Sequence, residues 1–194
     1  MIESLASTAT EVTIPPPPVS VSMSEYDAVV YDLDGTLVDL NVDWNRVAED
    51  VLEVYETEDV EPPSENLWDL LGYADDAGVR SEVESTIASH ERTGAETAPR
   101  LAHADELLER TVPVGVCSLN CEAACRIALE KHGLAEPVDV VVGRDTVSTW
   151  KPDPEPLLEA VRTLGADPEE TVFVGDSERD EVTARRAGTA FEYV

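Results

Sequence analysis

The sequence has 194 residues, of which 42 are Asp or Glu and 13 are Lys or Arg, so its formal net charge at pH 7 is −29. A surface this acidic excludes nucleic acids and anionic membranes as partners, because both are bound chiefly through Lys and Arg. The chain has neither the ~20-residue apolar run of a membrane span nor a recognisable secretory signal. We therefore expect a cytoplasmic protein with one domain, or a core domain with a small insertion.

Residues 1–24 are predicted to form a disordered leader. They are rich in Ser and Thr and contain four consecutive prolines, Pro15 to Pro18, which favour extended polyproline conformations. Met23 stands just before the first apolar run, so translation from Met23 is an alternative to translation from Met1.

From residue 25 onward, apolar runs of strand length alternate with segments of helical periodicity. The first predicted strand, 26–32, contains the uninterrupted apolar run Ala28–Tyr31, as expected for a parallel strand that is covered on both faces. The later strands are predicted at 111–117, 138–142, 171–175 and 189–194. The helices between them are predicted at 100–110, 120–132, 154–164 and 178–187, and glycines follow the last three. This order predicts an α/β fold with a doubly wound, Rossmann-like, five-stranded parallel sheet, whose site lies at the carboxyl ends of the strands.

Residues 40–97 interrupt that alternation with helical patterns alone. Apolar residues recur at helical spacing from Trp44 to Tyr55, a second helix is expected from Leu67, and a third is expected over 80–90. We therefore predict a core domain made of residues 25–39 and 98–194, with a helical cap of residues 40–97 inserted after the first strand.

Three cysteines, Cys117, Cys121 and Cys125, are spaced four residues apart. A metal cluster is one interpretation, but Cys117 is expected to end a strand while the other two lie on the next helix, and no His falls in the window. We expect reduced thiols that pack as small apolar side chains.

The first predicted strand ends in two carboxylates, Asp32 and Asp34, followed by Gly35. Such a pair at the end of a buried strand is costly to leave without a positive partner. A dication would relieve that cost, and Mg²⁺ prefers hard oxygen ligands. One carboxylate could then attack phosphorus while the other protonates the leaving oxygen.

Three later segments extend this chemistry. Ser118 and Asn120 follow the second strand at the start of a helix, where an anion can bind. Lys151, one of only two lysines, lies between Trp150 and Pro152 on the loop before another helix. A second acidic group, Asp176 and Asp180, follows the fourth strand, where a metal ion would lie.

In order and placement, these four segments resemble the motifs of the haloacid dehalogenase-like (HAD) hydrolase superfamily, over residues 26–194. The sequence is most similar to the phosphoglycolate-phosphatase-like branch. The resemblance implies Asp32 as nucleophile and metal ligand, and Asp34 as general acid and base that also offers its backbone carbonyl to Mg²⁺. It implies that Ser118, Asn120 and Lys151 bind phosphate. It also implies that Asp176 binds the metal, and that Asp180 supports it directly or through water.

The resemblance also implies a small phosphorylated substrate, because dehalogenases of the superfamily lack the second aspartate. The sequence departs from the branch in having Leu119 between Ser118 and Asn120, and in its short cap, so the substrate itself is left open. A phosphomutase of the same superfamily and a non-catalytic binding relative are the alternatives. The oligomeric state is also left open.

Two further expectations concern the surface and the cap. The acidic, lysine-poor composition resembles that of proteins from salt-loving microbes, in which molar salt screens self-repulsion. Five cap side chains are candidates to line the pocket, although core packing is favoured for the aromatic one and ion pairs or solvated faces for the arginines: Trp44, Arg46, Arg80, His90 and Arg92.

Overall fold

The computed structural model describes residues 26–194 and contains a five-stranded sheet in the order β3-β2-β1-β4-β5, with every pair of neighbours parallel. Each observed strand lies inside its predicted range, which confirms the expected fold class. The strands are β1 (Ala28–Tyr31), β2 (Val114–Cys117), β3 (Val140–Val142), β4 (Thr171–Gly175) and β5 (Ala190–Tyr193). The predicted leader, 1–24, lies outside the described residues.

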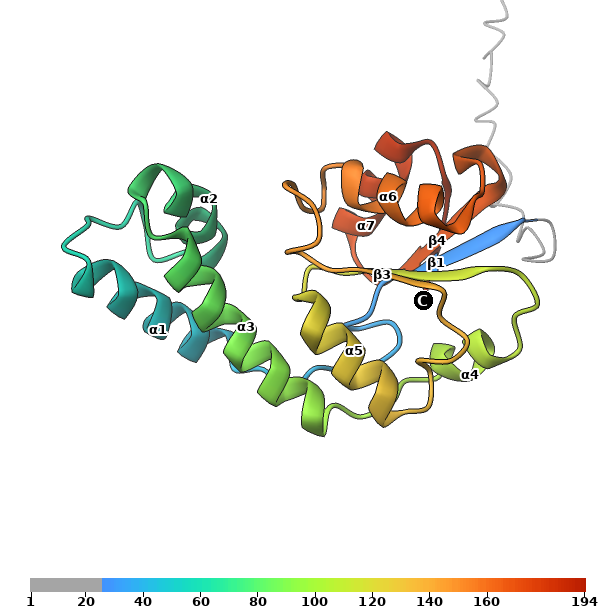
Figure 1. Ribbon diagram of the computed structural model, residues 1–194, viewed down its shortest axis with the longest axis horizontal. Helices are drawn as coiled ribbons and strands as arrows, with labels where there is room; N and C mark the ends of the chain where they lie inside the picture. The colour runs from blue at the N-terminus through green and yellow to red at the C-terminus, as the bar shows by residue number, and fades with distance from the viewer. Residues whose placement is uncertain (1–25) are drawn as a thin grey trace, which may run out of the picture.

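Two layers of helix cover the sheet, one on each face (Figure 1). Alternate side chains of β1 point to opposite faces, so Val29 and Tyr31 enter one apolar cluster and Val30 enters the other. The first cluster contains side chains of α4 (His103–Leu108) and α5 (Glu122–Lys131), and the second contains side chains of α6 (Glu155–Leu164) and α7 (Glu178–Ala187). Burial on both faces explains why the strands read as continuous apolar runs.

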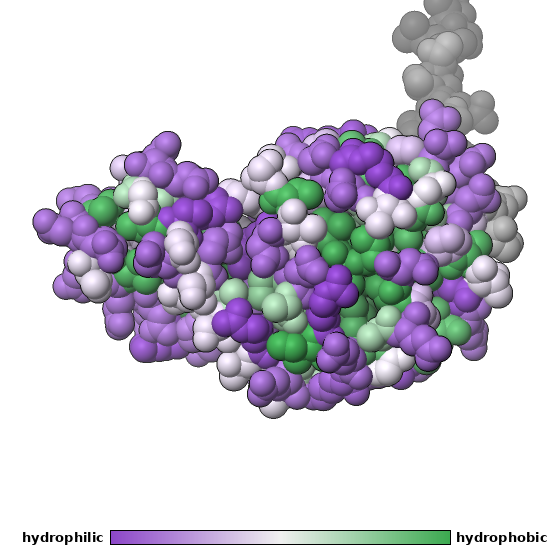
Figure 2. Space-filling view, in the orientation of Figure 1, coloured by the Kyte–Doolittle hydropathy of each residue, from purple (hydrophilic) through white to green (hydrophobic). Residues whose placement is uncertain are grey.

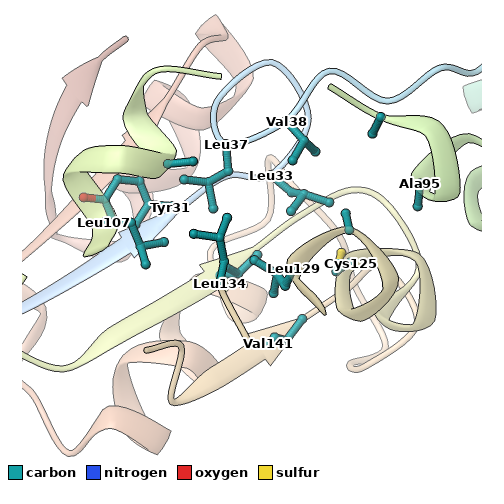
Figure 3. Packing of buried hydrophobic residues seen from close by; sticks show 14 of the residues in the cluster. Tyr31, Leu33, Leu37, Val38, Ala95, Leu107, Cys125, Leu129, Leu134 and Val141 are labelled. Atoms are coloured by element: carbon teal, nitrogen blue, oxygen red, sulfur yellow. The ribbon is translucent and has the colours of Figure 1, made fainter. Parts of the chain in front are cut away.

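The larger cluster extends beyond the sheet into the loop that follows β1 (Figure 3). Leu33 and Leu37 of that loop are fully buried and belong to the same cluster as Leu129 and Leu134. This packing fixes the backbone immediately after Asp32, because a loop anchored by two buried leucines has little freedom to move.

The cap consists of three helices, α1 (Trp44–Thr57), α2 (Leu67–Ala77) and α3 (Arg80–Thr97), which share a separate apolar cluster. Asp43 and Asn66 accept hydrogen bonds from the first-turn N–H groups of α1 and α2, so each helix begins at a side-chain cap. Tyr55 is fully buried in this cluster and donates its hydroxyl to the carbonyl of Leu70 at 2.6 Å.

Helix α3 is longer than the predicted 80–90 and runs without interruption to Thr97. Its first half packs in the cap through Val83 and Ile87, whereas Ala95, near its end, belongs to the core cluster beside α5 (Figure 1). The helix therefore joins the cap to the core. The division at residues 40 and 97 stays a prediction.

The three cysteines are free and buried, as expected for small apolar side chains. Burial raises the pKa of Cys117 to about 12 and that of Cys121 to about 11, so both thiols stay protonated at neutral pH. Within residues 26–194, no helix is long and apolar enough to cross a membrane. Figure 2 shows hydrophilic residues over much of the visible surface, with hydrophobic residues gathered in the middle of the larger part of the molecule.

Candidate active site

The predicted site residues follow the carboxyl ends of three adjacent central strands. Asp32 comes directly after β1, Ser118 after β2 and Asp176 after β4. Strand β1 lies between β2 and β4, so the strand order reverses at this point. The crevice at such a reversal is where open α/β sheets bind ligands.

Lys151 links two of the predicted carboxylates. Its Nζ lies 2.8 Å from Oδ1 of Asp32 and 2.5 Å from Oδ1 of Asp180, and all three side chains are nearly inaccessible to solvent. The other carboxylate oxygen of Asp180 accepts a hydrogen bond from Ser177 Oγ at 2.5 Å, within the capping box that begins α7. Both carboxylate oxygens of Asp180 therefore accept hydrogen bonds from protein side chains, and Asp180 holds the lysine next to Asp32.

Burial controls the ionisation of this group. It raises the pKa of Asp32 to about 6, against the opposing attraction of Lys151. Burial also tends to lower the pKa of Lys151, but the attraction of Asp32 and Asp180 outweighs it and the net shift is upward. The lysine is thus a permanent cation at neutral pH. Its attraction offsets only part of the effect of burial on the pKa of Asp32.

A candidate metal position lies beside the lysine. Carboxylate oxygens of Asp32, Asp176 and Asp180 all come within 4.8 Å of one another. Burial and the repulsion of Asp180 raise the pKa of Asp176, and Lys151 is the one cation paired with these three carboxylates in the described chain. The residues fit Mg²⁺, since they supply hard oxygen donors and excess negative charge.

The backbone after β1 makes room for Asp176. Gly35 has φ = +84°, and a Cβ atom there would lie 2.2 Å from Oδ2 of Asp176. Any side chain at this position would therefore displace the aspartate as well as strain the turn. The glycine that follows the Asp-Leu-Asp segment thus allows the loops after β1 and β4 to meet.

Asp34 lines the same cavity as Asp32 and Asp176, but it is not one of the three clustered carboxylates. Its Oδ1 accepts a 2.7 Å hydrogen bond from the backbone N–H of Leu40, which orients the side chain. Burial raises its pKa to about 6, opposed by that hydrogen bond. A carboxyl group with such a pKa can both donate and accept a proton near neutral pH.

Ser118 and Asn120 form a tight turn after β2. Ser118 Oγ donates to Oδ1 of Asn120 at 3.0 Å and accepts from the backbone N–H of Asn120 at 3.2 Å. The carboxylate of Glu91 in α3 accepts from Asn120 Nδ2 at 3.4 Å and from the backbone N–H of Cys121 at 3.0 Å. Both predicted residues line the cavity, and α3 supports their loop from behind.

A buried ion pair, missed by the sequence analysis, holds this arrangement. Arg144, on the loop after β3, makes a two-pronged contact with Glu91, at 2.5 and 3.1 Å. Arg144 also donates to the carbonyl of Leu119 at 2.7 Å and pairs with Glu84 at 2.9 Å. Glu91 is fully buried and Arg144 is 2% exposed, so this contact joins α3 to the Ser118 loop without solvent screening.

The cavity has a volume of about 610 Å³ and is bounded by both the core and the cap. The cap contributes Trp44 and Trp68, and α7 contributes Arg179, whose guanidinium lies 4.6 Å from the centre of the Trp68 ring. The expectation that Trp44 packs in the core is wrong, because this residue is 38% exposed and lines the cavity. It begins α1 on the side of the cap that faces the site.

The other candidate cap residues do not line this cavity. Arg46 pairs with Glu49 and Asp50, and Arg80 pairs with Asp75 and Glu84, which confirms the expected ion pairs. His90 contacts Asp50 at 2.8 Å.

Comparison with known proteins decides the family. The sequence profile described as haloacid dehalogenase-like hydrolase matches residues 29–194, almost all of the described chain. The chain belongs to this family. It is a HAD-like hydrolase, and the matched range includes all four segments that contain the candidate site residues.

Individual proteins with similar sequences or folds include two phosphatases and a HAD-superfamily hydrolase. The phosphoglycolate phosphatase of Rhodospirillum rubrum is 35% identical over 183 residues, which cover 83% of this chain and 76% of that protein. The pyrophosphatase PpaX of Bacillus cereus is 33% identical over 182 residues, covering 84% and 80%. The fold matches a HAD-superfamily hydrolase of subfamily IA from Geobacter sulfurreducens, with a TM-score of 0.56, 24% identity and 86% of each chain covered.

Proposed function

We propose that this HAD-like hydrolase is a Mg²⁺-dependent phosphatase that cleaves small phosphorylated metabolites through an aspartyl-phosphate on Asp32. The observation that carries the proposal is the convergence of Asp32, Asp176 and Asp180 beside the buried ammonium group of Lys151. Phosphoryl transfer depends chiefly on positioning and on neutralising the charge of the phosphoryl oxygens. This cluster supplies a nucleophile, a fixed cation and candidate ligands for a second cation.

Asp32 and Asp176 would hold Mg²⁺ directly, together with the backbone carbonyl of Asp34, while Asp180 supports the ion through water. When bound, the ion supplies positive charge next to the phosphoryl oxygens. Lys151 and the Ser118–Asn120 turn would bind the remaining oxygens of the phosphoryl group.

In the first step, a carboxylate oxygen of Asp32 bonds to phosphorus as the bond to the leaving oxygen breaks. Asp34 donates its proton to that oxygen, so the alcohol leaves neutral. Asp34, now ionised, then takes a proton from a water molecule whose oxygen attacks phosphorus. The acyl-phosphate bond breaks, which releases phosphate and regenerates Asp32. A pKa of about 6 for Asp34 suits both proton transfers.

The named relatives support a small, strongly anionic substrate. Phosphoglycolate and pyrophosphate, after which the two relatives are named, each carry a second anionic group next to the phosphoryl group. The cavity of about 610 Å³ accommodates molecules of this size.

The test is steady-state release of inorganic phosphate from p-nitrophenyl phosphate. We expect turnover with Mg²⁺, none with excess EDTA, and full recovery when Mg²⁺ is restored. Phosphate released in equal amount to nitrophenol distinguishes a phosphatase from a phosphomutase, which would return the phosphoryl group to an organic acceptor. Absence of turnover with p-nitrophenyl phosphate and with the two metabolites above would refute the proposal.

We also propose that the enzyme works in a cytoplasm of high salt. With 42 acidic and 13 basic residues, the chain has a large excess of negative charge, and these like charges repel one another. We expect the melting temperature to rise on the order of 10 °C between about 0.1 and 3 M NaCl, as screening removes a few kcal/mol of repulsion. Melts in sorbitol of equal osmolality control for exclusion effects, and equal melting temperatures at the two salt concentrations would contradict this prediction.

A further inference from the structure

We infer that Arg179 binds a second anionic group on the leaving part of the substrate, a carboxylate or a phosphoryl group, and so selects substrates with two anionic groups. This inference rests on the proposed phosphatase function and deepens it. It is based on which charged side chains around the cavity already have an ion-pair partner and which do not.

Most arginines of this chain are already paired. Among residues 26–194, carboxylates lie within ion-pair distance of seven of the eleven. Arg179 has no such partner within the described residues, although carboxylates outnumber cations more than three to one in the sequence. Of the arginines without a carboxylate partner, it alone lines the catalytic cavity.

The aromatic ring of Trp68 fixes the guanidinium in place. At 4.6 Å from the ring centre, the contact orients Arg179 while leaving its N–H donors without a carboxylate partner in the described chain. A planar guanidinium held in this way is suited to two-pronged recognition of a carboxylate or a phosphoryl group. The ring belongs to the cap and the arginine to the core, so the position depends on both.

The other charged side chains that line the cavity do not favour binding of a second anion. Asp32, Asp34, Asp176 and Glu178 also line it, and Lys151 is already bonded to Asp32 and Asp180. An anionic leaving group therefore meets repulsion along the cavity except at Arg179. Lys151 would supply positive charge to the transferring phosphoryl group and Arg179 would supply it to the leaving group, an arrangement that fits a small substrate with two anionic groups.

The experiment compares kcat/KM for phosphoglycolate, pyrophosphate and glycerol 3-phosphate, whose leaving group is uncharged. For Arg179→Gln, we expect the ratio of kcat/KM on phosphoglycolate to that on glycerol 3-phosphate to fall roughly 10- to 100-fold, as a charged hydrogen bond is lost. The same ratio for pyrophosphate shows whether the second phosphoryl group is bound in the same way. Arg179→Lys should lose less, because it keeps the charge without the planar fork.

Arg185→Gln is the matched control. Arg185 is an exposed residue of the same helix, outside the cavity, and its replacement changes the net charge equally. An equal fall in the ratio for this variant would assign the effect to overall charge and overturn the inference. An equal loss on all three substrates in Arg179→Gln would assign the residue to cap closure and would also overturn it.

A binding measurement separates this inference from the proposed function. In an Asp32→Asn background, which removes the nucleophile, calorimetry with phosphoglycolate and glycerol 3-phosphate reports affinity without turnover. We expect Arg179→Gln to weaken binding of phosphoglycolate at least 10-fold more than that of glycerol 3-phosphate. Equal weakening would refute the role of Arg179, whether or not the wild-type protein is active on either compound.

Discussion

Replacing Asp32 by Asn is expected to lower kcat for p-nitrophenyl phosphate by roughly 10⁴-fold or more, because the amide cannot form the acyl-phosphate. The side chain is nearly isosteric, so the cavity and the Lys151–Asp180 contact should persist. Phosphate release from the purified variant and the wild-type protein, both with Mg²⁺, measures the effect.

Two controls separate lost chemistry from lost structure. Asp39→Asn, an exposed aspartate on the same loop, should change kcat by less than about threefold. Asp32→Asn should also melt no lower than the wild-type protein at pH 7.5 without metal. A carboxyl group whose folded pKa of about 6 exceeds its unfolded value stabilises the fold only at low pH, and that contribution is lost as pH rises through 6. Activity above one-hundredth of wild type in a folded variant would exclude Asp32 as nucleophile.

Breaking the buried pair of Glu91 and Arg144 is expected to cost the most stability. Arg144→Met leaves the fully buried Glu91 carboxylate without a positively charged partner, next to the neutral donors of Asn120 and Cys121. Removing one partner of such a pair typically costs about 3–5 kcal/mol, a large share of the roughly 5–15 kcal/mol that stabilises a domain. Denaturant unfolding at fixed salt gives the change in free energy of unfolding.

The double variant Arg144→Met with Glu91→Leu should recover part of that loss, because no buried charge is then left unpaired. Arg162→Met provides the matched control, since Arg162 is 53% exposed and its pairs with Glu155 and Glu159 lie in solvent. It should cost less than about 1 kcal/mol. A loss this small for Arg144→Met as well would show that the buried pair does not stabilise the fold.

The sheet and the residues at its carboxyl edge were predictable from the sequence because their signals are local. Buried parallel strands are continuously apolar, and Asp32, Ser118 and Asp176 each follow one directly. The carboxyl ends of parallel strands lie at one edge of the sheet. The parallel arrangement alone therefore brings these residues together, although they are far apart in the chain. The position of Lys151 beside Asp32 follows less directly, since a loop separates it from β3.

The contacts between cap and core were not predictable, because they depend on how two packed units dock. Glu91 and Arg144 are 53 residues apart, and α3 contains several other glutamates. One signal was present: Glu91 lies four residues after Ile87 and four before Ala95, on the buried face of the helix. The contact between Trp68 and Arg179 has no such signal, since both lie near helix starts in separate units.

Helix α3 contributes side chains to both hydrophobic cores, Val83 and Ile87 to one and Ala95 to the other. The stabilities of the two cores are therefore coupled. If one core unfolds and α3 unwinds, apolar surface of the other core becomes exposed. Cap and core should denature in a single cooperative transition. Deletion of residues 40–97 would remove apolar side chains of α3 from the cluster that they share with α5. The remaining core domain should therefore not fold on its own.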